Sequence, residues 1–74
     1  MITPEVLKNL LDTAFPGGQI TVQSADNVHF SASVKTAQFA GLSRVTQQQK
    51  VYAALGDLIT TGKIHALSLQ TAAL

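Results

Sequence analysis

The first part of the chain has apolar and polar positions arranged with the period of a helix. The apolar residues recur at three- and four-residue spacing, as one buried face of an amphipathic helix requires: Val6, Leu7, Leu10, Leu11 and Ala14. Thr3, Pro4 and Glu5 predict its start, because they fit the N-cap, the first helical position and the positive end of the helix dipole. The sequence Phe-Pro-Gly-Gly at residues 15–18 predicts its end.

The period then changes to two, which is typical of strands with one buried face. Ile20 and Val22 alternate with polar residues over residues 19–23. A second alternating run covers residues 28–35, with Val28 and the apolar residues at every second position after it predicted to point inward. The short polar link at residues 24–27 favours a β-hairpin.

A second helix is predicted from Ser43, as N-cap, to Thr61, with Gly62 following its end. We expect its buried face to be the stripe formed by Val45, Gln48 or Gln49, Tyr52, Leu55, Leu58 and Ile59. A final strand is predicted from Ile64 to Gln70.

The element order is thus α-β-β-α-β, an α+β fold. A helical crossover joins parallel strands, so the second and third strands are predicted to be parallel and the first two antiparallel. We therefore expect a three-stranded mixed sheet with the helices on one face. A length of 74 residues predicts one domain over residues 1–74.

Composition narrows the functional classes. The chain has no cysteine and a net charge of only +1, which argues against strong electrostatic binding of nucleic acid. No run approaches the roughly 18 apolar residues of a membrane span, and residues 1–5 lack the features of a signal peptide. We expect a cytoplasmic protein without a membrane association.

Catalytic chemistry has few candidates in this sequence. The four carboxylates are scattered, and Gly17 and Gly18 do not belong to a phosphate-binding GxxxxGK loop. A chain of this size also leaves little room for a deep pocket that excludes water. The protein is predicted not to be an enzyme.

The two histidines are the first candidates for chemistry. His65 opens the third predicted strand and His29 lies near the start of the second, so parallel strands would place both at one end of the sheet. Neutral imidazole is a good ligand for iron or zinc. However, His29 shares its strand alternation with serines and His65 with leucines, which predicts opposite faces. A histidine at a strand end is also commonly a structural residue, and the residues alone leave both roles open.

The start of the second helix carries the other candidates. Arg44 and Lys50, with glutamines between them, could contact phosphates and base edges of a nucleic acid. The alternative is an ordinary solvated helix face.

Three ordered blocks resemble the signature of the BolA-like protein family. They are residues 39–45 (FAGLSRV), 49–55 (QKVYAAL) and 64–69 (IHALSL), and the pair His29-Phe30 stands where many members have His-Phe. The resemblance covers roughly residues 20–70. The short hairpin link and the run of three glutamines most resemble the IbaG-type branch of the family.

The resemblance implies a fold like a class II KH domain and a partnership with a monothiol glutaredoxin. Members share a [2Fe–2S] cluster in that complex, where the glutaredoxin cysteine and a glutathione thiol hold one side. His65 would then be one ligand from this chain, and His29 is the candidate for the second. The implied role is iron–sulfur cluster trafficking or regulation of iron homeostasis.

The family resemblance also implies a role in transcriptional control and the stress response. The alternative function is therefore a nucleic-acid-binding regulator that uses the second helix, with Arg44 and Lys50 as its contacts. The chain lacks the GxxG loop of RNA-binding KH domains, since Gly41-Leu42-Ser43-Arg44 has no second glycine. A weak homodimer is left open.

Overall fold

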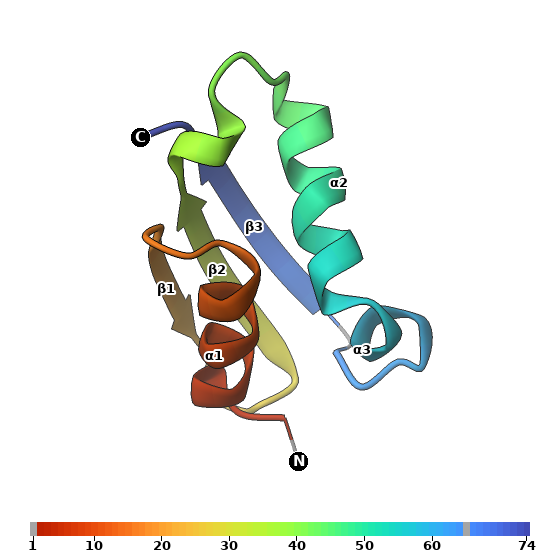
Figure 1. Cartoon of the computed structure of the whole chain (residues 1–74). Coiled ribbons are helices and arrows are strands. Elements are labelled where there is room, and N and C mark those ends of the chain that lie inside the picture. Colours follow the sequence, from red (N-terminus) through yellow and green to blue (C-terminus); the bar gives the residue numbers. More distant parts are fainter. Residues whose placement is uncertain (1, 65) are drawn as a thin grey trace.

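One face of a three-stranded sheet is covered by helices in the computed structural model, which describes residues 2–64 and 66–74 (Figure 1). The strands β1 (Gln19–Gln23), β2 (His29–Lys35) and β3 (Ala66–Ala72) lie side by side in that order. β1 and β2 are antiparallel, whereas β2 and β3 are parallel. The predicted α+β class, the mixed sheet and the helices on one face are confirmed.

Helix α1 (Pro4–Ala14) begins as the sequence predicts. The Thr3 hydroxyl accepts a hydrogen bond from the N–H of Val6 at 3.3 Å, so it satisfies one of the free donors of the first turn. Leu7 and Leu11 point into the core, and the N–H of Phe15 closes the helix on the carbonyl of Leu11.

The second predicted helix is shorter than expected. α2 (Arg44–Leu55) starts at the Ser43 N-cap but ends at Gly56, and a single turn, α3 (Asp57–Thr60), follows. The cause is local, because Gly56 adopts a positive φ of 49°, which breaks the helical path and which glycine tolerates without a Cβ clash. The prediction of one helix up to Thr61 was wrong.

The predicted buried face of this helix was right only in part: Leu55 is buried, and Leu58 and Ile59 in the following turn pack against the core. The residues that α2 buries are Gln47, Val51 and Leu55, whereas Val45 is 65% and Tyr52 40% exposed. Gln47 is accommodated inside because its side-chain amide donates to the carbonyl of Leu42 at 2.9 Å. A buried amide is tolerated when it has a hydrogen-bond partner. The positions of the apolar residues alone therefore did not predict the orientation of this helix.

The strand boundaries differ by a few residues. Val28 lies before β2 and is exposed, because its N–H is bound in the preceding turn by the Asp26 carboxylate. β3 begins at Ala66 and reaches Ala72, further than the predicted Gln70, since it pairs with β2 along its whole length to Lys35.

The core lies between the sheet and the helices. Phe39, in the short 3₁₀ helix η1 (Ala37–Phe39), is fully buried and meets Phe15 edge to face at 5.3 Å between ring centroids. Alternate residues of β2 complete the layer: Phe30, Ala32 and Val34. No helix formed by the described residues covers the opposite face of the sheet, which is polar, as the alternation in β2 predicts.

Candidate functional site

A polar turn connects β1 and β2 at the lower end of the sheet in Figure 1. Oδ1 of Asp26 accepts from the backbone N–H groups of Val28 and His29, each at 2.9 Å. The Ser24 hydroxyl donates to the carbonyl of His29 at 2.7 Å and accepts from the N–H of Asn27. Asn27 has a positive φ of 58°, a conformation that asparagine tolerates better than most residues. These bonds fix the backbone from which His29 projects.

The second oxygen of Asp26 reaches the histidine ring. Oδ2 lies 2.9 Å from His29 Nδ1. The side-chain hydrogen bond with His29, followed by the bonds from the N–H groups of His29 and Val28, holds the pKa of Asp26 well below its usual range. Because an ionised carboxylate only accepts hydrogen bonds, we assign the proton to Nδ1 of His29. In the neutral ring, this leaves the Nε2 lone pair available to a metal ion.

His29 is also accessible to a partner, since its side chain is 72% exposed. It pairs with Ala66 at the start of β3, so the parallel strands predicted from the crossover begin side by side. His29 shares the polar sheet face with Ser31, while Leu67 and Leu69 pack against the core on the other face. His65, the other predicted ligand, lies outside the described residues.

The described residues offer one imidazole nitrogen, that of His29, to a metal ion. Among residues 2–64 and 66–74, no group of three or more histidines, carboxylates or cysteines comes together. The sequence has no cysteine, so thiolate ligands of an iron–sulfur cluster would have to come from another molecule. An exposed imidazole whose second nitrogen is bound by a carboxylate is the arrangement that metal-ligating histidines commonly have.

Asp26 was not among the site residues predicted from the sequence. The signal was present, because aspartate followed by a histidine three residues later, inside a short polar link, fits an Asx turn that binds the following backbone N–H groups. The contact of the second oxygen with the ring depends on the geometry of the turn and could not be obtained from spacing alone.

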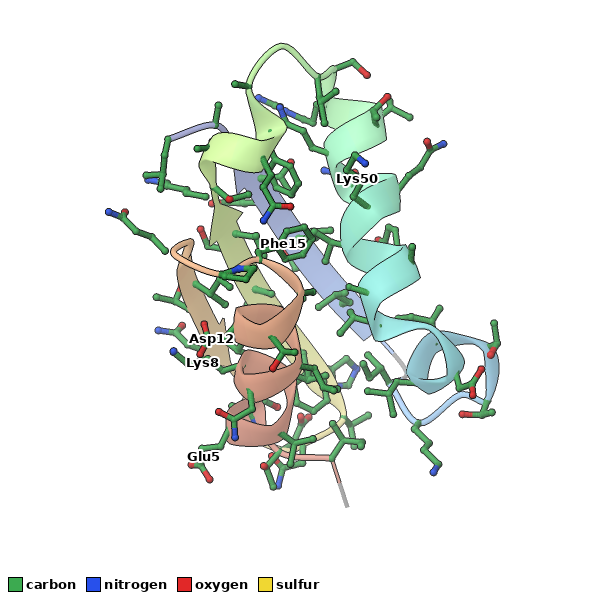
Figure 2. The ribbon with its side chains drawn as sticks, viewed as in Figure 1. Glu5, Lys8, Asp12, Phe15 and Lys50 are labelled. Atoms are coloured by element: carbon green, nitrogen blue, oxygen red, sulfur yellow. The ribbon has the colours of Figure 1, made fainter. Side chains whose placement is uncertain are left out.

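The two basic residues of the alternative site do not form one cluster. Arg44 is the first residue of α2 and Lys50 lies six residues later, about 120° around an α-helix. Figure 2 shows Lys50 on α2, and on α1 it shows Lys8 beside Asp12, with which Lys8 forms an ion pair at 2.8 Å. Neither Arg44 nor Lys50 has an ion pair with another described residue.

Arg44 instead lines a groove together with Lys35, the last residue of β2. The groove has a volume of about 290 Å³. Gln48 lies one turn after Arg44 on the same side of α2, and Gln70 and Thr71 of β3 also line the groove. This groove was not predicted from the sequence, because its lining comes from three separate elements, β2, α2 and β3.

The family model for BolA-like protein matches residues 2–74 of this chain. An uncharacterised protein of Haemophilus influenzae is 40% identical over 67 residues, which span 90% of this chain and 73% of the relative. The acid stress protein IbaG of Escherichia coli is 40% identical over 47 residues, 64% of this chain and 56% of IbaG.

The solved structures lead to the same family. A BolA protein homologue from Coxiella burnetii is 35% identical and superposes with a TM-score of 0.75, covering 99% of this chain and 92% of the homologue.

None of the described helices is long and apolar enough to cross a membrane.

Proposed function

Because the chain belongs to the BolA-like protein family, we propose that it is a non-enzymatic cytoplasmic partner of a monothiol glutaredoxin. In this role it shares a [2Fe–2S] cluster with the glutaredoxin and glutathione, and serves cluster trafficking or the regulation of iron homeostasis. The observation that supports this proposal is the His29 ring, exposed at the sheet end with its Nδ1 bound to Asp26.

The side-chain types of this chain decide which cluster ligands it can supply. It offers imidazole but no thiolate, so it supplies one side of the cluster only when a cysteine-bearing partner supplies the other. His29 and His65 are the proposed ligands of this side. Ala66, the first residue of β3, pairs with His29. His65 precedes Ala66 in the sequence.

Asp26 is a positioning residue in this proposal. Its carboxylate keeps the proton on Nδ1 of His29 and thereby directs the Nε2 lone pair outward. Its bonds to the N–H groups of Val28 and His29 hold the backbone of the turn, which lowers the ordering cost when the partner binds.

Reconstitution with a monothiol glutaredoxin, glutathione, iron and sulfide tests the proposal. We expect a heterodimer with visible absorption and circular dichroism spectra that differ from those of the glutaredoxin homodimer. The spectrum should be lost in His65→Ala, and His29→Ala should lose it or change it strongly. Lys35→Gln is the matched control, because Lys35 is exposed at the opposite end of the same strand.

Two results would contradict the proposal. One is a glutaredoxin spectrum unaltered by this chain, and the other is a heterodimer spectrum that survives replacement of both histidines. Size-exclusion chromatography of the apo proteins distinguishes a failure to bind the partner from a failure to ligate the cluster.

A nucleic-acid-binding regulator is the second candidate, through Arg44 and Lys50. The net charge of +1 and the separation of the two side chains around α2 support it less well. It predicts gel shifts with DNA at low salt that weaken steeply as salt rises, because each neutralised phosphate releases counterions.

A further inference from the structure

We propose that the groove between β3 and the start of α2 is a binding site for a small phosphate-bearing ligand, with Arg44 and Lys35 as its two cationic contacts. The site lies at the end of the sheet away from His29, and nothing in the proposed cluster chemistry uses it. The groove combines two cations, a buried hydroxyl without a hydrogen-bond partner among the described residues, and a size that fits a small molecule.

The charge around the groove is one-sided. Arg44 and Lys35 both line it, and none of the described residues adds an acidic side chain. Neither cation forms an ion pair with another described residue, whereas Lys8 has Asp12 and His29 has Asp26 as partners. Two unneutralised cations in one concavity attract an anion, and the concave shape strengthens their field compared with that of a flat surface.

The uncharged lining fits the same ligand chemistry. The side-chain amides of Gln48 and Gln70 can donate hydrogen bonds to oxygens, as can the hydroxyl of Thr71. The Thr71 oxygen is buried and has no hydrogen-bond partner among the described residues. Such a group is uncommon in a folded protein and indicates a missing partner. We infer that the ligand, or a water molecule that bridges to it, supplies that partner.

The pairing of arginine with lysine favours phosphate over a carboxylate. A guanidinium binds two oxygens of a phosphate side by side, and an ammonium adds a point charge. A phosphate monoester carries a charge of roughly −1.5 to −2 at neutral pH, which two cations balance, whereas a carboxylate carries only one. A volume of about 290 Å³ lies at the small end for ligand pockets, so a small molecule fits better than a large cofactor.

Inorganic phosphate is the probe, added to ¹⁵N-labelled full-length chain and compared with acetate at equal ionic strength and pH. We expect saturable amide shifts at the residues that line the groove, with an affinity for phosphate at least tenfold higher than for acetate. Arg44→Gln and Lys35→Gln should each lower the phosphate affinity at least tenfold. Arg44→Lys should have an intermediate effect, because it keeps the positive charge but loses the paired N–H donors of the guanidinium.

Lys50→Gln is the matched control, since Lys50 is exposed on the same helix and does not line the groove. It should leave the affinity within twofold. Equal shifts with acetate, or an affinity unchanged in Arg44→Gln at an unchanged melting temperature, would overturn the proposal.

A short single-stranded DNA oligonucleotide forms the second arm of the test. If it binds more tightly than inorganic phosphate and its binding depends on Lys50 as strongly as on Arg44, the groove belongs to a nucleic-acid surface and the small-ligand proposal is wrong. Binding of phosphate without binding of the oligonucleotide supports it.

Discussion

The two ends of the three-stranded sheet differ in how their charged side chains are arranged. At the end where β2 and β3 begin, the imidazole of His29 is held by Asp26, and that carboxylate also binds two backbone N–H groups. At the end where these strands finish, Lys35 and Arg44 line a groove without an acidic side chain. One end therefore has its polar groups bound within the chain, and the other has cations without a partner among the described residues.

The difference is instructive because the same two strands form both ends. A side chain that is already held in position loses little freedom when it binds, which suits a ligand that must meet a metal in one geometry. Exposed cations suit a diffusible anion, which is attracted from a distance and arranges its own contacts. This difference is the reason for proposing cluster ligation at the first end and anion binding at the second.

The largest expected effect comes from a substitution in the hydrophobic core, because unfolding would remove the sites at both ends of the sheet. Phe39 is fully buried against Phe15, so Phe39→Ala should lower the free energy of unfolding by about 3–5 kcal/mol. That is a large part of the total stability of a small domain. Urea denaturation at pH 7 measures it, and Phe39→Leu should cost less. A loss below about 1 kcal/mol would contradict the described packing.

The second prediction separates the two functions of Asp26. Asp26→Asn keeps an oxygen for the N–H groups of Val28 and His29 but presents an amide to Nδ1, which favours the tautomer with the proton on Nε2. We expect near-normal stability and cluster binding weakened by about 10–100-fold, the usual cost of losing such a partner. Cluster transfer to an acceptor and thermal melting measure the two quantities. If both fall in parallel, Asp26 has only a structural role.

Asp26→Ala and Lys35→Gln complete that comparison. Asp26→Ala removes the bonds to the turn as well as the bond to the ring, so both stability and cluster binding should fall. Lys35→Gln should change phosphate binding alone. A cluster that is equally weakened by Lys35→Gln would contradict the separation of the two ends.

The third prediction concerns Thr71, whose buried hydroxyl lacks a partner among the described residues. Thr71→Val keeps the shape and removes the unpaired group, so it should raise the free energy of unfolding by about 1 kcal/mol in phosphate-free buffer. Phosphate binding should weaken at the same time. Loss of stability in Thr71→Val, measured by urea denaturation, would show that the hydroxyl has a partner in solution.

The smallest expected effect is the pH dependence of the Asp26 turn. The hydrogen bonds from His29 and Val28 hold the pKa of Asp26 below its ordinary value of 3.8 in the folded chain. Its contribution to stability is therefore present above that value and is lost as the pH falls through the lowered pKa. Carboxyl ¹³C NMR should show Asp26 still ionised at pH 3.8, with its interaction with the Val28 and His29 amides retained. A midpoint at or above 3.8 would contradict the hydrogen bonding described here.

The topology could be predicted from the sequence because it depends on period and order. The change from helical to alternating spacing identified α1, β1 and β2, and the helical crossover predicted the parallel pairing of β2 with β3. The buried face of α2 could not be predicted this way, because Gln47 is stabilised inside by the carbonyl of Leu42, a contact that hydropathy does not register. The helix break at Gly56 depends on a positive φ, which the hydropathy pattern does not indicate either.

The candidate sites were predictable to different degrees. Sequence order and parallel pairing were enough to place His29 at the start of β2, opposite Ala66. Its partner Asp26 required the shape of the turn. The groove could not be predicted from the sequence, because Lys35 and Arg44 come from different elements and their approach depends on how α2 packs beside β3.

Pulsed electron paramagnetic resonance of the reduced cluster tests the central claim most directly. The glutaredoxin complex is prepared with this chain labelled with ¹⁵N only at histidine, so that coupled ¹⁵N nuclei can come only from His29 and His65. We predict strong imidazole coupling to the cluster, with one contribution removed in His29→Ala and the other in His65→Ala. A cluster that forms in the heterodimer without ¹⁵N coupling would contradict histidine ligation by this chain.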